Sequence, residues 1–265
     1  MFHFPPLAAE VVFHLGNFPV TNSFVNAVVV SVLFIVAAAY FGRRLKPVPS
    51  GFQHILEIAV ETVLDYMDRV THDREKSLKF FPIVGTLFFF ILLSNWIGVL
   101  PGIGSITILG SEHGSLVPFP LFRPANADLN LTVAMAVVAV VGAHVFGVMT
   151  IGFWKYADRF IKLGTLWKLL RKGGIGIFVG FIEFFVGLIE IISEVAKVVS
   201  LSLRLFGNIF AGEVLLTVMA SLIAYAVPLP FLLLEMLVGI IQAMVFAMLA
   251  LVYLSVATTE MEASH

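Results

Sequence analysis

The sequence predicts an all-α polytopic membrane protein, and its composition, segment lengths and charge placement each point to that class. Of the 265 residues, 60% are hydrophobic and 12% are charged, whereas a soluble domain carries roughly 25% charged residues. Several apolar stretches reach the length of about 20 residues that a membrane-crossing helix needs. We therefore expect a single membrane domain over residues 1–265 with about five crossing helices and one amphipathic surface helix.

The first crossing is expected at residues 20–40, directly before a basic cluster of Arg43, Arg44 and Lys46. A cleavable signal has its basic residues before the apolar run, so this order argues against one. The stretch is also not rich in Arg and Ser, which makes an organelle transit peptide the less favoured interpretation.

The surface helix is expected at residues 51–71, where polar and apolar side chains separate onto two sides with helical period. Ser50 and Gln53 have the spacing of a capping box at its start. A helix of this kind lies along a membrane surface. Because its polar side is acidic, packing against the protein's own helices is the favoured alternative to binding anionic lipid.

The second and third crossings are expected at residues 80–100 and 130–153. Each contains one isolated polar residue, Asn95 in the second and His144 in the third, and a hydrogen bond between helices is the favoured role for both. Two aromatic residues that fit an interfacial belt follow the third crossing: Trp154 and Tyr156.

The loops predict the topology, because basic residues concentrate in cytoplasmic loops. The loops at 41–50 and 154–172 are rich in Lys and Arg, whereas the loop at 101–129 has Arg123 as its one basic residue. We therefore expect the N-terminus outside and the C-terminus in the cytoplasm. The expected location is a bacterial plasma membrane, with an organelle inner membrane less favoured.

Residues 175–227 contain no proline and would form a helix about 80 Å long at 1.5 Å per residue. The hydrocarbon core is only about 30 Å thick, so a single helix must be steeply tilted. A tight hairpin near 197–202 is the alternative. A last helix is expected at 231–257, after a turn at Pro228 and Pro230, and the two helices would form a long tilted hairpin.

Ionisable and small residues recur at steps of three, four or seven along the long helix and form one stripe: Glu183, Glu190, Glu194, Lys197, Ser200, Arg204, Asn208 and Ala211. A charge at the bilayer centre costs about 2.5–3.5 kcal/mol, so each charged residue is a candidate functional residue. Glu213 lies nine residues beyond Arg204. That spacing places it on the opposite face, about 14 Å further along the axis. In the last helix, Glu235 and Gln242 share a face.

Arg204 is a permanent cation, since a guanidinium is effectively never deprotonated. Glu190 and Glu194 lie on its cytoplasmic side, and Glu213 and Glu235 lie on its outer side. Carboxylates interrupted by a fixed cation make two partial ion paths with an electrostatic barrier between them. For Glu194, a structural ion pair with Lys197 or Arg204 is the alternative.

Three motifs resemble subunit a of F-type ATP synthases. The most specific is Ser202-Leu203-Arg204-Leu205-Phe206-Gly207-Asn208, continued by Ala211-Gly212-Glu213. The run Ile241-Gln242-Ala243 with Tyr253-Leu254 resembles the family's last helix, and Ala127-Asp128-Leu129-Asn130 resembles the start of its third crossing. The likeness covers most of residues 80–257.

The resemblance implies a proton-translocating stator subunit that offers two offset half-channels to a rotating c-ring. Arg204 would face the essential carboxylate of each passing c subunit and separate the half-channels. The outer half-channel would be lined by Glu213, Glu235, Asn208 and Gln242. Candidates for the inner one are Glu190, Ser193 and Glu194. The choice between H⁺ and Na⁺ depends on the partner's carboxylate.

The resemblance also implies partners and an absence of catalysis in this chain. The partners are the c-subunit ring, the peripheral stalk b subunit, the rest of the ATP synthase and membrane lipid, with no nucleic acid. The ATP chemistry would belong to other subunits, in keeping with the lack of a phosphate-binding loop in the sequence. No cofactor and no metal are expected.

A self-contained ion channel or secondary transporter is the rival function. Such a protein needs a closed pathway within one chain, and many transporters are built from internal repeats. The one-sided stripe and the lack of a sequence repeat argue against that function. A membrane enzyme is disfavoured because the sequence shows neither a metal cluster nor a nucleophile–base pair.

Overall fold

The structure is a computed structural model, and it describes residues 6–100, 102–103, 106–112, 115–161, 175–222 and 228–259. It confirms the all-α polytopic class. Four helices are long and apolar enough to cross a membrane: α1 (Asn22–Gly42), α3 (Arg74–Val99), α4 (Leu129–Ile151) and α8 (Pro228–Thr258). The other helices are α2 (Phe52–Thr71), the short α5 (Phe153–Ile161), the long α7 (Ile175–Leu222) and one 3₁₀ turn, η2 (Ala125–Ala127).

Helix α7 is continuous over 48 residues, which gives a length of about 72 Å. It passes through Lys197 and Ser202 without a break, so the hairpin alternative at that point is wrong. The predicted end at residue 227 lies outside the described residues. Helix α8 begins at Pro228 itself, where the missing N–H of proline is tolerated in a first turn.

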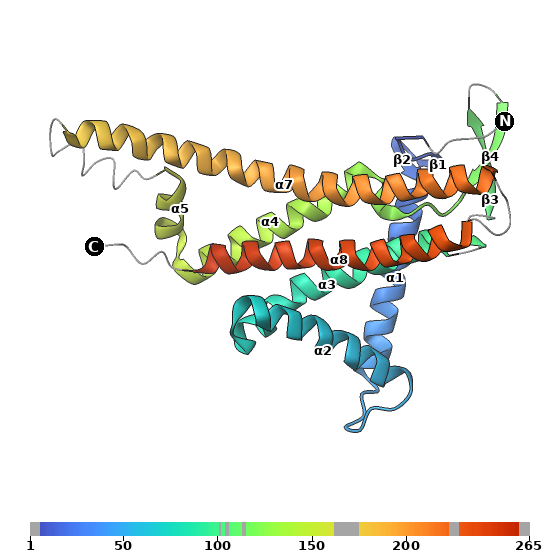
Figure 1. The fold of residues 1–265 in the computed structure, drawn as a ribbon, viewed down its shortest axis with the longest axis horizontal. Coiled ribbons are helices and arrows are strands. Elements are labelled where there is room, and N and C mark those ends of the chain that lie inside the picture. Colours follow the sequence, from blue (N-terminus) through green and yellow to red (C-terminus); the bar gives the residue numbers. More distant parts are fainter. Residues whose placement is uncertain are drawn as a thin grey trace.

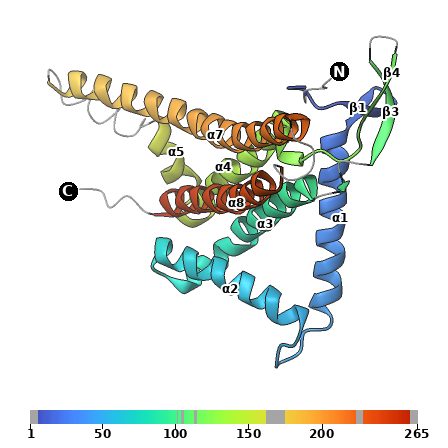
Figure 2. The same ribbon diagram turned by 45° about the vertical axis from the view of Figure 1, so that its right-hand side comes forward.

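Helices α3, α4, α7 and α8 pack together and form the core, with α7 and α8 running side by side (Figure 1). Helix α1 stands across the direction of α7 and α8 in both views (Figure 2). Small residues in α4 and α8 allow close approach of the helices, and five of them are fully or almost fully buried: Ala136, Ala139, Ala143, Ala247 and Ala250. On α7, the buried residues follow one line: Leu201, Leu205 and Ile209.

Local capping explains where two of the crossings begin. Helix α3 starts at Arg74, before the predicted residue 80, because the Asp73 side chain accepts hydrogen bonds from the backbone N–H groups of Glu75 and Lys76. Helix α4 starts at Leu129, where the Asp128 side chain accepts from the Asn130 N–H group at 2.9 Å.

The predicted capping box of α2 is wrong. The residue that caps the helix is Gly51, with φ of 61° and no side-chain cap hydrogen bond. Glycine adopts this conformation without a steric penalty. The Gln53 side chain instead holds the preceding loop through the backbone of Lys46 and also donates to Glu57 at 2.7 Å.

Helix α2 packs against the protein's own helices, as the alternative interpretation of its acidic side proposed. Its buried residues Val63, Leu64 and Met67 join the core, and α2 contacts both α3 and α8. Apolar residues at its start, among them Phe52 and Ile55, remain exposed.

The structure contains two short antiparallel hairpins that the sequence analysis did not predict. Strands β1 (Val11–Leu15) and β2 (Phe18–Thr21) form the first, and β3 (Thr107–Glu112) and β4 (Ser115–Pro120) form the second. In the second hairpin Thr107 pairs with Pro120 and Glu112 pairs with Ser115. Strands β1 and β3 touch each other, so both hairpins lie at the same end of the molecule (Figure 1).

The two aromatic residues of the predicted interfacial belt have different surroundings. Trp154 is 83% exposed, as an interfacial residue would be in the isolated chain. Tyr156 is 6% exposed, and its hydroxyl forms a 2.7 Å hydrogen bond with Nδ1 of His144. Tyr156 therefore packs inside the protein, since α5 folds back against α4 and α7.

Candidate functional site

Arg204 lies on an open side of α7, next to the line of buried residues. Leu201 and Leu205 turn into the core, while Arg204 itself is exposed. Four other residues of the predicted face are exposed as well: Ser193, Ser200, Asn208 and Ala211. This surface of α7 is therefore open to another molecule.

The Arg204 guanidinium forms no ion pair and no hydrogen bond within the part of the chain that the structure describes. Tyr253 of α8 lies within range of its electrostatic influence. One turn along α7, Asn208 donates a hydrogen bond to Oε1 of Gln242 at 2.7 Å and so links α7 to α8. The structure thus presents a permanent cation beside a polar contact between the two helices.

A cavity of about 440 Å³ lies further along α7 and contains both outer acids, Glu213 and Glu235. Its other lining residues come from α3, the end of β4, the segment after β4 and α7, and include Gly98, Arg123, Pro124 and Thr217. The structure therefore brings together the two glutamates that the sequence placed on neighbouring helices. As the spacing predicted, Glu213 faces away from the Arg204 side, because it turns toward Arg123.

Arg123 is the residue that the sequence analysis missed at this site. It is 2% exposed, and its Nε lies 3.0 Å from both carboxylate oxygens of Glu213. Its other two nitrogens donate to the backbone carbonyls of Pro6 (2.9 Å) and Ala8 (3.3 Å). Its occurrence as the one Lys or Arg of the loop at 101–129 was the signal that could have marked it.

Glu235 is 7% exposed and lies directly against Gly212 of α7. A Cβ atom at position 212 would overlap its carboxylate, so the glycine is what allows the approach. Its Oε1 is buried without a hydrogen-bond partner among the described residues. Nε2 of Gln242, on the same face of α8, is also buried without one.

On the other side of Arg204, the inner candidates are arranged differently. Glu194 accepts a 2.6 Å hydrogen bond from Lys197, and its other oxygen lies 3.5 Å from Nε2 of His144. The structural alternative for Glu194 is therefore realised with Lys197 and not with Arg204. The space here is about 10 Å³. Glu190 is half-buried and Ser193 is exposed, so neither faces the same small space.

The predicted hydrogen bonds between helices are confirmed for both isolated polar residues. Asn95 of α3 donates to the Gly239 carbonyl of α8 at 3.4 Å and accepts from Asn126 at 2.6 Å. His144 of α4 contacts Tyr156 of α5 and Glu194 of α7.

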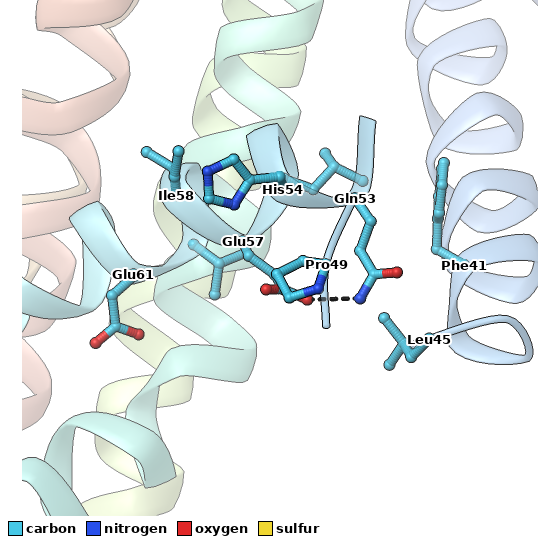
Figure 3. Close-up of a pocket in the computed structure, with 10 residues that line it drawn as sticks. Phe41, Leu45, Pro49, Gln53, His54, Glu57, Ile58 and Glu61 are labelled. Atoms are coloured by element: carbon cyan, nitrogen blue, oxygen red, sulfur yellow. Dashed lines mark hydrogen bonds between the residues drawn. The ribbon is translucent and has the colours of Figure 1, made fainter. Parts of the chain in front are cut away.

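A second cavity, of about 690 Å³, lies between the end of α1 and the start of α2, far along the chain from the stripe (Figure 3). Phe41 and Leu45 line one side, and Gln53, Glu57 and Glu61 line the other. It lacks the buried charges of the outer cavity. Among the described residues, no group of three or more His, Asp and Glu side chains is placed to hold a metal ion.

Comparisons with known proteins decide the family. The model of the ATP synthase A chain family matches residues 22–255. The chain belongs to the ATP synthase A chain family. A protein named ATP synthase subunit a from Trichlorobacter lovleyi is 34% identical over 239 residues, which is 89% of this chain and 88% of that protein. Two further proteins of the same name are similar over comparable lengths. The one from Legionella pneumophila is 30% identical over 248 residues, which is 93% of this chain and 90% of that protein. The one from Moorella thermoacetica is 29% identical over 244 residues, which is 92% of this chain and 94% of that protein.

Membership in the ATP synthase A chain family agrees with a multi-pass membrane protein that works within an ATP synthase together with other subunits. The matched region includes α1, α3, α4, α7, most of α8 and every residue of the outer cavity.

Proposed function

We propose that this chain is the stator subunit a of an F-type rotary ATP synthase, and that it passes protons to and from a ring of c subunits. The observation that carries the proposal is the exposed Arg204 guanidinium, which has no partner among the described residues. A charge within the bilayer is costly unless it is paired or hydrated. A carboxylate on a neighbouring subunit would supply the missing partner.

Two half-channels would meet at this cation. The outer one would be lined by Glu213, Glu235, Asn208 and Gln242, because the two acids share a cavity and the two amides are hydrogen-bonded beside it. The inner one would involve Glu190, Ser193 and Glu194. Arg204 lies between the two groups along α7, and its positive charge would prevent protons from crossing directly.

The steep tilt of α7 against the ring belongs to the same proposal. A helix of about 72 Å fits a hydrocarbon core of about 30 Å only if it lies far from the membrane normal. Its direction across α1 supports this orientation (Figure 2). The acids on the two sides of Arg204 would then be laterally separated. A voltage worth about 2.3 kcal/mol per charge per 100 mV could therefore drive rotation of the ring.

The partners and the topology complete the proposal. The chain would contact the c-ring through the face that carries Arg204, and it would also bind a peripheral stalk b subunit, with ATP chemistry left to other subunits. The N-terminus would lie outside and the C-terminus in the cytoplasm of a bacterium. A self-contained channel or transporter would instead conduct ions alone in liposomes.

Cysteine crosslinking within the intact complex tests which face of α7 meets the ring. The sequence contains no cysteine, so single cysteines at Ser193, Ser200 and Asn208 can be introduced without background. We expect each to crosslink to a cysteine in a c-subunit helix. Val195 is also exposed but lies nine residues before Arg204, on the opposite face, and serves as the matched control. Crosslinking from Val195 in place of the other three would contradict the proposal.

A further inference from the structure

We propose that Arg123 is a positioning residue of the outer half-channel, which fixes Glu213 as an anion and leaves Glu235 as the carboxyl that carries protons. The proposal rests on the proposed function, since it divides the work between two residues of that half-channel. It gives the two glutamates different roles, although they line the same cavity.

The contacts of Arg123 are those of a fixed structural charge. All three guanidinium nitrogens are used: Nε on the carboxylate of Glu213, and the other two on the carbonyls of Pro6 and Ala8. The side chain is almost completely buried. A guanidinium stays charged under all physiological conditions, and a buried charge needs a charged partner. Glu213 therefore has to remain a carboxylate for as long as this contact exists.

The N-terminal segment is tied to the same contact. Its Glu10 accepts hydrogen bonds from the side chain and the backbone N–H of Asn22, at the start of α1. The like charge of Glu10 acts against the anionic form of Glu213, and the charge of Arg123 acts in its favour. The Asn26 side chain of α1 donates to the Arg123 carbonyl at 2.8 Å. Arg123 thus connects α1, the N-terminal segment and α7 at one side of the cavity.

Glu235 has the opposite surroundings. One of its oxygens is buried without a hydrogen-bond partner, and none of the described bases lies within ion-pair distance of its carboxylate. Burial without a cation penalises the charged form of a carboxyl group. Glu235 is therefore suited to hold a proton and to release it when a c subunit or water in the cavity can accept that proton.

The two roles predict that single and double replacements of Arg123 and Glu213 rank in an order that a simple list of channel residues does not predict. Replacing Glu213 alone leaves the buried Arg123 cation without its partner, in a cavity that protons must enter. Replacing Arg123 and Glu213 together removes both charges and leaves the cavity neutral. The double replacement should therefore do less harm than the single one.

The test uses the complete ATP synthase, reconstituted in liposomes, with passive proton flow normalised to the amount of this subunit in the complex. We expect Glu213→Gln to slow the flow by about tenfold, as an unpaired buried charge would. Arg123→Gln/Glu213→Gln should recover to within about threefold of the unmodified complex, because no unpaired charge is left. Glu235→Gln should stay slow in both backgrounds.

A further variant separates positioning from general packing. Arg123→Lys keeps the cation but loses the planar fork. Complexes with this variant should therefore conduct protons better than complexes with Arg123→Gln alone, at equal assembly.

Arg204→Ala serves as the control for the proposed function. It should lose ATP synthesis driven by a proton gradient. If Arg204→Ala behaves as expected but the double variant is absent from the complex or as slow as Glu213→Gln, the role of Arg123 is overturned while the proposed function stands.

Discussion

The two polar regions on either side of Arg204 differ in the space that they enclose and in the pairing of their charges. The outer region has a cavity of about 440 Å³, with two carboxyl groups and one buried guanidinium. The inner region holds about 10 Å³, with Glu194 and Lys197 in contact at 2.6 Å. A water molecule needs a cavity of about 10–15 Å³, so only the outer region has room for several.

Under the proposed function, this difference would place the outer path largely within this chain and the inner path away from the Glu194 pair. The residues that close the inner region come from three further helices, since His144, Tyr156 and Tyr253 all line it. Glu190 and Ser193 lie outside that small space, toward the surface of α7. An inner path would therefore run along the open surface of α7, where the ring would form its other wall.

The largest expected effect in the outer region comes from its two acids. Glu213→Gln and Glu235→Gln should each slow ion flow by about tenfold, because the first leaves the Arg123 cation unpaired and the second removes the carboxyl that would exchange protons. Residues that share a site are not additive, so the double variant should be less impaired than the product of the two losses. Passive proton flow in liposomes measures all three. Strictly multiplicative losses would assign the two acids to separate paths.

Gly212→Ala tests the same cavity without a change of charge. A Cβ atom at this position would overlap the Glu235 carboxylate, so the side chain has to move. We expect a loss of flow of roughly three- to tenfold, in the range of an overpacked buried site. Gly42→Ala is the control, since no atom lies within 4 Å of the added methyl group there. Equal behaviour of both variants would show that the approach of Glu235 to Gly212 has no role.

A smaller effect is expected in the inner region. Glu194→Gln/Lys197→Gln removes both members of a largely buried ion pair, so neither charge is left without its partner. Proton flow should fall by no more than about threefold, since the proposed water path does not run through this pair. A loss as large as that of Glu235→Gln would contradict the difference between the two regions.

The smallest effect is expected outside the membrane part, at α2. The neighbouring Ser77 hydroxyl and the Arg74 guanidinium lower the pKa of Asp68 below its ordinary value of 3.8. The carboxylate therefore stabilises the fold fully above that value, and the stabilisation is lost as the pH falls through the lowered pKa. Asp68→Asn should reduce the melting temperature slightly at pH 7 and by less at about pH 3, where part of the stabilisation is already lost. An equal reduction at both pH values would show that the charge is not involved.

The sequence was sufficient to predict the helices and the stripe, because both depend on local periodicity. Residues 130–153 were predicted for α4, which spans Leu129–Ile151, and the unbroken long helix followed from the absence of proline. The boundaries shifted where a cap decided them. Asp73 moved the start of α3, and the positive φ of Gly51 replaced the expected Ser50 cap of α2.

The contacts that complete the outer site depend on tertiary structure and could not be predicted. Arg123 and Glu213 are separated by 90 positions, and no local pattern relates them. The β3–β4 hairpin places Arg123 at the end of α7, yet its two prolines made the segment resemble a simple loop. Tyr156 was assigned to the membrane interface for the same reason, since the return of α5 onto α4 is not encoded in its periodicity.

Replacement of Arg204 tests most directly the proposal that this chain is the proton-translocating stator subunit. ATP synthesis driven by a proton gradient should be measured in membranes that contain Arg204→Ala, with assembly of the complex confirmed by co-purification of the c-ring. We expect an assembled complex without synthesis, because the cation between the proposed half-channels is gone. Arg204→Lys should also be severely impaired, since a compact ammonium does not replace the planar guanidinium. Normal rates of synthesis in Arg204→Ala membranes would contradict the account.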